Sequence, residues 1–203
     1  MKTLLALFIA FAASAVVLAQ DIALPAAQTT GGMPIMEALA KRATGRNYGS
    51  RELTQQQLAN LLWAAFGVNR PDGRRTAPSA SNTQENEIYV LMKSGTFVYD
   101  AGKHLLRLVV AEDLRSLAGK ETTVTLLFVA DLSKRSGGTT ESKKNVACID
   151  SGFISENIYL YCASEGLATG YRGSFNRQAL TPKLKLRPEQ EIIAVQSVGF
   201  PPP

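Results

Sequence analysis

Two short stretches of this chain suggest both its fold and its chemistry. Residues 42–48 read Arg-Ala-Thr-Gly-Arg-Asn-Tyr, and residues 78–84 read Pro-Ser-Ala-Ser-Asn-Thr-Gln. The first stretch places two guanidinium groups and a hydroxyl close together, a set that can bind a phosphate or another anion. The second combines small residues, which let a ligand approach the backbone, with polar groups that can orient a ring. Taken singly, the first also suits a solvated helix end and the second an ordinary polar turn.

The composition is that of a globular protein. The chain has 203 residues, of which 45% are hydrophobic and 19% are charged, so we expect one domain or one protomer of an intertwined dimer. Its formal net charge is +5, but the basic residues lie in scattered groups. The sequence contains no basic stripe interleaved with aromatics and no known nucleic-acid module, so nucleic acid is not an expected partner.

The N-terminus resembles an export signal. Lys2 precedes an almost wholly apolar stretch over 4–18, and small residues end this segment at Ala19. We therefore predict that residues 1–19 are a signal peptide cleaved before Gln20, and that the mature protein is periplasmic or extracellular. The alternative is a helix retained as a membrane anchor. No later apolar run is long enough to span a bilayer, so no stable anchor is expected.

Helical spacing and helix start and stop signals indicate four helices, over 34–42, 54–66, 113–117 and 154–165. The second is the clearest, because Thr54 and Gln57 fit a capping box and Gly67 follows the last apolar position. Residues 20–33 have no clear periodicity and are expected to be a flexible lead-in. The polar, basic stretch 133–145 is expected to be an exposed loop.

Alternating or continuous apolar residues indicate five strands, over 87–92, 96–99, 104–110, 122–130 and 191–198. The fourth is rich in β-branched residues and should be a buried central strand. The loop over 69–82 is long for a structureless connection, which makes it a candidate functional loop. We expect one α+β domain over 34–203, with a mostly antiparallel or mixed sheet flanked by helices.

Several catalytic systems are excluded by the residues present. His104 is the only histidine, so neither a histidine-based zinc site nor a serine protease triad is supported, and no metal is predicted. The sequence also lacks a phosphate-binding P-loop and a dinucleotide-binding glycine turn after a strand. Cys148 and Cys162 could form a disulfide after export, or Cys162 could be a buried free thiol.

Together, and at this spacing, the two stretches resemble the FMN-dependent nitroreductase superfamily. The family motif Arg-Arg-Ser-x-Arg-x-Phe is matched by Arg42, Thr44, Arg46 and Tyr48, with Ala43 where a second basic residue is usual. The family loop Pro-Ser-Ser-x-Asn-x-Gln is similar to residues 78–84. Four further segments resemble the SagB-type branch of thiazole- and oxazole-forming oxidases, namely 61–67, 75–79, 150–167 and 195–201.

This resemblance implies a nitroreductase-like fold, an intertwined homodimer and FMN as cofactor. Arg42 and Thr44 would bind the phosphate and the ribityl chain, and Arg46 would lie near the pyrimidine edge of the flavin. A backbone N–H near Gly173 or Ser174 would face flavin N5. The residues expected to reach across the dimer to the partner's flavin are Pro78, Ser79, Ala80, Ser81 and Asn82.

The implied function is an oxidoreductase that passes two electrons, as hydride, through bound flavin by a ping-pong scheme. Its partners would be a small electron donor and a small conjugated substrate, and the flavin would carry the chemistry without a catalytic side chain. Export would separate the protein from cytoplasmic NAD(P)H. Ala43 and a C-terminus without a basic residue support the alternative of a non-catalytic exported binding protein with weakened flavin binding. Lys183, Lys185 or Arg187 could compensate for the missing cations.

Overall fold

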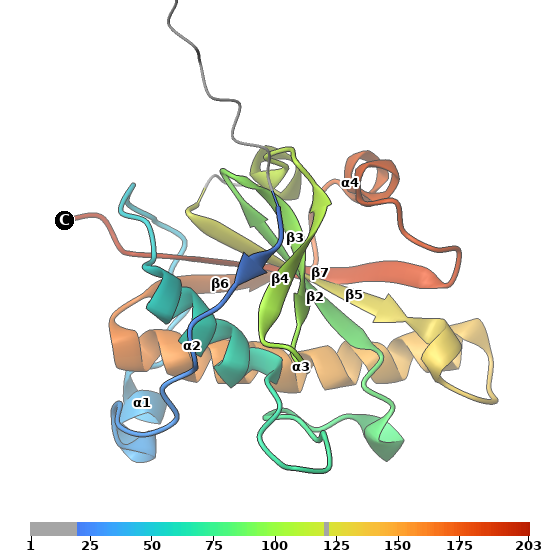
Figure 1. The fold of residues 1–203 in the computed structure, drawn as a ribbon, viewed down its shortest axis with the longest axis horizontal. Helices are drawn as coiled ribbons and strands as arrows, with labels where there is room; N and C mark the ends of the chain where they lie inside the picture. Colours follow the sequence, from blue (N-terminus) through green and yellow to red (C-terminus); the bar gives the residue numbers. More distant parts are fainter. Residues whose placement is uncertain (1–19, 120–121) are drawn as a thin grey trace, which may run out of the picture.

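A seven-stranded sheet forms the centre of the computed structural model, which describes residues 20–119 and 122–203 (Figure 1). The predicted signal peptide lies outside these residues. The strand order is β1-β4-β3-β2-β5-β7-β6, and every pairing is antiparallel. The predicted α+β class with an antiparallel sheet is therefore confirmed.

The strands are β1 (Ile22–Ala23), β2 (Asn86–Met92), β3 (Gly95–Asp100), β4 (Leu105–Val110), β5 (Val124–Asp131), β6 (Ala168–Arg172) and β7 (Gln190–Gly199). The α-helices are α1 (Ile35–Lys41), α2 (Gln55–Phe66), α3 (Thr140–Glu165) and α4 (Arg177–Leu184). Short 3-10 turns occur at η1 (Ala80–Asn82), η2 (Arg115–Ala118) and η3 (Leu132–Lys134).

The sheet separates two apolar layers. Every residue of β5 is buried, and its side chains alternate between the layers, as strand geometry requires. Phe128 belongs to the layer that includes residues of α2 and α3, whereas Leu127 belongs to the layer that includes residues of α4. Figure 1 shows the long helix α3 crossing the sheet, with α4 at another edge of the molecule. The prediction of a buried central strand is confirmed.

The start of α2 is confirmed in detail. The Thr54 hydroxyl accepts a hydrogen bond from Gln57 N at 3.1 Å, and Thr54 N donates to Gln57 Oε1 at 3.0 Å. This reciprocal pair satisfies two N–H groups that a helix start otherwise leaves free. Gly67 is the C-cap, also as predicted.

The expectation of an exposed loop over 133–145 was wrong. Helix α3 begins at Thr140, because the Thr139 hydroxyl accepts a hydrogen bond from Ser142 N at 3.1 Å and caps the first turn. The first turns of α3 are mostly exposed, and Ala147 is their first buried residue. The residues of these turns are therefore polar and show no apolar periodicity, so no helix was predicted there. The C-terminal part of α3 and its Gly166 C-cap agree with the prediction.

The expected lead-in over 20–33 contains a strand. Ile22 pairs with Leu106 at the sheet edge, and Leu108 N donates to Asp21 Oδ1 at 2.8 Å. Backbone pairing thus connects the segment to β4. A strand of two residues is too short to produce a periodic pattern of side chains, so the sequence did not predict it.

Cys148 and Cys162 are both free thiols, the first exposed and the second buried. Both lie on α3, roughly four turns or about 21 Å apart along its axis, which exceeds the span of a disulfide. Their pairing, left open by the sequence, is thereby excluded within one chain. Within the described ranges, no helix has the length and apolar character needed to cross a membrane.

Candidate functional site

The first motif lies against strand β6. Gly45 N donates a hydrogen bond to Thr169 O at 2.9 Å. A side chain on Gly45 would lie 3.1 Å from the Ala168 Cβ, and one on Gly170 would lie 3.3 Å from Gly45 O. Glycine at both positions lets the two backbones approach this closely. The motif is thereby held beside the strand that leads into the predicted N5-facing loop.

Tyr159 of α3 connects the motif to β6. Its hydroxyl lies 3.1 Å from the Thr44 hydroxyl and accepts a hydrogen bond from Tyr171 N at 3.0 Å. The Arg42 guanidinium lies 5.5 Å from the centre of the same ring, within cation–π range. Sequence reasoning assigned Tyr159 no role, because one tyrosine on a half-buried helix gives no signal of its own.

Arg172 adds a further guanidinium that the sequence did not predict. It donates to Ser197 Oγ at 3.1 Å and to Ala118 O at 3.0 Å. Burial raises the pKa of Tyr48, while the nearby charges of Arg172 and Arg46 act to lower it. These groups therefore share one electrostatic environment. Arg172 immediately precedes Gly173, so its position in the sequence was the available signal.

The residues present fit an FMN molecule. Arg42 is half-buried and Arg46 is exposed, and neither is paired with a carboxylate within the described part of the chain. Uncompensated guanidinium groups beside the Thr44 hydroxyl suit a phosphate or an anionic ring edge. A side chain added at Gly173 would meet no atom within 4 Å, so the loop after β6 is open to a ligand.

The second motif lies elsewhere on the same chain. Ala80 N donates to Asp150 Oδ2 at 2.9 Å, which fixes the motif near the middle of α3. Asp150 and Tyr159 are about 13 Å apart along the helix axis. Figure 1 places α1 toward one end of α3 and the turn at 80–82 toward the other. One chain therefore does not bring the two motifs together, and their convergence in a dimer stays a prediction.

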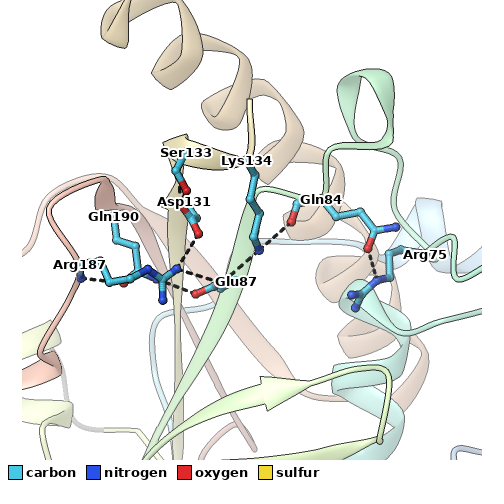
Figure 2. Close-up of polar contacts among 8 residues, drawn as sticks. All are labelled: Arg75, Gln84, Glu87, Asp131, Ser133, Lys134, Arg187 and Gln190. Atoms are coloured by element: carbon cyan, nitrogen blue, oxygen red, sulfur yellow. Dashed lines mark hydrogen bonds and ion pairs between the residues drawn. The ribbon is translucent and has the colours of Figure 1, made fainter. Parts of the chain in front are cut away.

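Polar contacts fasten the end of this loop to the sheet (Figure 2). Gln84 Oε1 accepts a hydrogen bond from Arg75 Nε at 2.9 Å. Lys134 Nζ donates to Gln84 O at 3.4 Å and forms an ion pair with Glu87 at 3.1 Å. The family glutamine at position 84 thus orders its own loop through both side chain and backbone.

The cations suggested as substitutes are engaged elsewhere. Lys183 pairs with Glu112 at 2.8 Å, and Arg187 pairs with Asp131 at 2.6 Å (Figure 2). Lys185 is exposed at the end of α4. The structure therefore gives Lys183 and Arg187 other roles and leaves Arg172 as the extra cation near the first motif.

His104 has a structural environment. Its Nδ1 lies 2.8 Å from the Tyr99 hydroxyl and its Nε2 lies 3.0 Å from Pro25 O. Burial lowers the pKa of the ring. With both ring nitrogens engaged, His104 connects the start of β4 to β3 and to the N-terminal segment.

A cavity of about 590 Å³ lies away from both motifs, and none of the predicted cofactor residues line it. Its apolar lining residues include Ile22, Leu53, Leu58, Phe97 and Val124. The lining also contains one cation, Lys93, together with the acidic Glu52. The first motif instead places two guanidinium groups and a hydroxyl close together, a donor set that suits a flavin phosphate. Charge and donor chemistry, rather than volume, therefore identify the candidate site.

Comparison with known proteins relates both the sequence and the fold to one family. The sequence model of the nitroreductase family matches residues 39–200. A crystal structure of a candidate nitroreductase from Ralstonia eutropha JMP134 has a TM-score of 0.87 and 36% identity, covering 91% of each chain. A curated candidate nitroreductase of Methanocaldococcus jannaschii is 28% identical over 166 residues, covering 74% of this chain and 84% of the relative. A chain of the Escherichia coli microcin synthetase McbBCD complex shares the fold, with a TM-score of 0.70 at 17% identity, covering 80% of this chain and 70% of that one.

Proposed function

This chain belongs to the nitroreductase family, and on that premise we propose that it is an FMN-dependent oxidoreductase. Membership supports flavin-dependent oxidoreduction in general. The observation that carries FMN in particular is the arrangement of Arg42, Thr44 and Arg46. The two cations have no carboxylate partner among the described residues, and the hydroxyl lies beside the strand that leads into the open loop at Gly173.

Each residue of the site has a defined task in this proposal. Arg42 and Thr44 bind the phosphate and ribityl chain, and Arg46 places a positive charge where it favours the anionic reduced ring. A backbone N–H at Gly173 or Ser174 would donate to flavin N5. When bound, FMN supplies two-electron hydride chemistry, which a ping-pong scheme uses between a small donor and a small conjugated substrate. No acid or base on the protein is required for that transfer.

The proposal includes a homodimer. Five large hydrophobic side chains on α1 and α3 are between 46% and 74% exposed, namely Ile35, Met36, Leu39, Ile149 and Phe153. Apolar groups gathered in this number on two helices are suited to a protein partner. A second copy that covers them could also bring its residues 78–82 to the flavin, which the separation of the two motifs in one chain requires.

The direct experiment measures flavin in the purified mature protein. We expect a yellow protein that releases FMN on denaturation, and a flavin-free form that quenches FMN fluorescence on titration with saturation near one FMN per chain. A colourless protein that ignores added FMN would contradict the proposal. That outcome would support the non-catalytic binding protein, which Ala43, in place of a usual basic residue, favours.

A second measurement, on the flavin-loaded protein, identifies the class of electron donor. If the chain is exported, as we also propose, NAD(P)H is not its natural reductant. Anaerobic mixing with candidate donors, followed by loss of the oxidised flavin absorbance, then identifies the class that reduces it. Reduction by NAD(P)H at rates far above those of quinols or thiols would contradict an extracytoplasmic donor.

A further inference from the structure

The loop proposed to meet the flavin has an unusual backbone. Ser81, Asn82 and Gln84 have φ angles of 56°, 52° and 49°, in the left-handed region that residues other than glycine rarely adopt. Such conformations persist only where the surrounding structure holds them. The contacts of this loop must therefore supply the restraint.

Asp150 supplies one such contact from the interior of α3. Its side chain is buried, with the residue only 3% exposed, and its Oδ2 accepts a hydrogen bond from Ala80 N at 2.9 Å. A carboxylate that accepts from a backbone N–H makes a short, strong hydrogen bond. This bond fixes the backbone just before the two left-handed residues Ser81 and Asn82.

Glu85 and Arg135 hold the other side of the same turn. Arg135 Nη1 donates to Ala80 O at 3.3 Å and to the Thr83 hydroxyl at 2.9 Å, and it pairs with Glu85 at 3.5 Å. The Thr83 hydroxyl donates to Glu85, which is fully buried. Burial, together with the neighbouring Glu85 carboxyl, raises the pKa of Asp150. Both backbone groups of Ala80 are thus bound within one partly buried cluster.

We propose that Asp150, supported by Glu85 and Arg135, is a positioning residue that keeps Ala80–Asn82 in the conformation that contacts the flavin of a partner subunit. What the loop contacts rests on the proposed function. The anchoring itself is a property of a single chain and can be measured without flavin.

Two variants separate the hydrogen bond from the mere presence of a side chain. Asp150→Ala removes the acceptor. Asp150→Asn keeps an oxygen that can accept from Ala80 N, and its amide can donate to Glu85. In the flavin-free protein, we expect hydrogen exchange of the Ala80 amide to become about tenfold faster or more in Asp150→Ala and to stay near wild type in Asp150→Asn.

Flavin affinity provides the second readout. We expect the Kd for FMN to rise about tenfold in Asp150→Ala and to stay within about threefold of wild type in Asp150→Asn. Circular dichroism and oligomeric state, unchanged in both variants, show that the fold is intact. If Asp150→Ala does not fold, Arg135→Gln replaces it, with faster exchange expected over residues 80–83 and weaker FMN binding.

The outcomes are distinct. Unchanged exchange at Ala80 in Asp150→Ala, or equal loss of affinity in both Asp150 variants, would overturn the positioning role. A wild-type protein that binds no FMN would instead refute the proposed function, and the exchange measurement would still decide whether Asp150 anchors the turn.

Discussion

Arg42 is the residue on which FMN binding would depend most directly in the proposed site. Its half-buried guanidinium lies over the Tyr159 ring and is not paired with a carboxylate in the part of the chain that the structure describes. The ring fixes the direction of the guanidinium without neutralising its charge. Because Ala43 replaces a usual basic residue, few other cations are available to bind an FMN phosphate.

Replacing Arg42 by alanine therefore tests its assigned role. We expect the Kd for FMN to rise about tenfold or more, since a hydrogen bond to a charged group contributes about 1.5–3 kcal/mol. Arg107→Ala is the matched control. Arg107 is an exposed arginine on β4, which lies toward the opposite edge of the sheet from β7 and β6. Fluorescence titration of both variants measures the difference. Equal affinities of Arg42→Ala and wild type would reject the role of Arg42.

A titration of Asp150 should appear in the stability of the protein. Burial, with Glu85 beside it and Arg135 acting in the opposite sense, raises the pKa of Asp150 from 3.8 to about 6. Between these values the folded state holds a proton that the unfolded state has released, so this group makes folding less favourable as pH rises through the window.

The comparison of wild type with Asp150→Asn isolates that contribution, because aspartates such as Asp113 and Asp131 have lowered pKa values and act in the opposite direction. Urea unfolding between pH 3.5 and 7 is the measurement. We expect Asp150→Asn to gain stability relative to wild type as pH rises. A difference that does not change with pH would contradict the raised pKa.

At the level of single residues, the sequence points to candidate ligands but not to what orients them. Arg42, Thr44 and Arg46 could be proposed because their chemistry is encoded by residue type and local spacing. Tyr159 and Arg172 could not, because their roles come from contacts across α3, β6 and β7. Such contacts become visible only when the sheet is assembled.

Helix α3 is the element that connects both motifs. Tyr159 meets the first motif and Asp150 meets the second, so the register of this helix sets the position of each. Its C-terminal part could be predicted from apolar spacing and Gly166. Its start could not, because the exposed turns after Thr140 carry polar residues and depend on the Thr139 cap.

The Thr139 cap gives a prediction for this element. Thr139→Ala should lower the free energy of unfolding by about 1 kcal/mol, the usual cost of losing an N-cap side chain. Thr140→Ala is the control, because it removes the same side chain from the first helical residue, which is exposed and does not cap the helix. Urea unfolding compares the two. Equal stability of both variants would show that Thr139 does not set the start of α3.

Two other elements were missed for physical reasons. Strand β6 contains Gly170, which weakens strand propensity but permits the close approach of Gly45. Helix α4 contains Pro182 and is capped by Asn176, whose side chain accepts from Ala179 N at 3.1 Å. In both cases the tertiary packing outweighs local propensity.

At the scale of the whole molecule, we propose that two chains form the flavin site. The exposed apolar side chains of α1 and α3, together with the separation of the two motifs along α3, support this proposal. Cleavage before Gln20, as proposed from the sequence, would leave Asp21 and its hydrogen bond to β4 in the mature protein. N-terminal sequencing checks this, with Gln20 expected as the first residue.

A charged pair of substitutions on α3 tests the dimer. We expect the double variant Ile149→Glu with Phe153→Glu to be monomeric by light scattering and to bind FMN at least about tenfold more weakly, because like charges would face each other across the interface and residues 78–82 of the partner would be lost. Lys103→Glu, an exposed substitution in the turn before β4, is the control. A wild-type monomer that binds FMN tightly would contradict the proposed dimeric site.

The most direct measurement is a crystal structure of the protein with FMN. We expect one flavin contacted by Arg42 and Thr44 of one chain and by Asn82 of the other, with a backbone N–H of Gly173 or Ser174 beside N5. Arg42 and Asn82 of neighbouring chains lying far apart, with no shared cleft between them, would contradict this expectation.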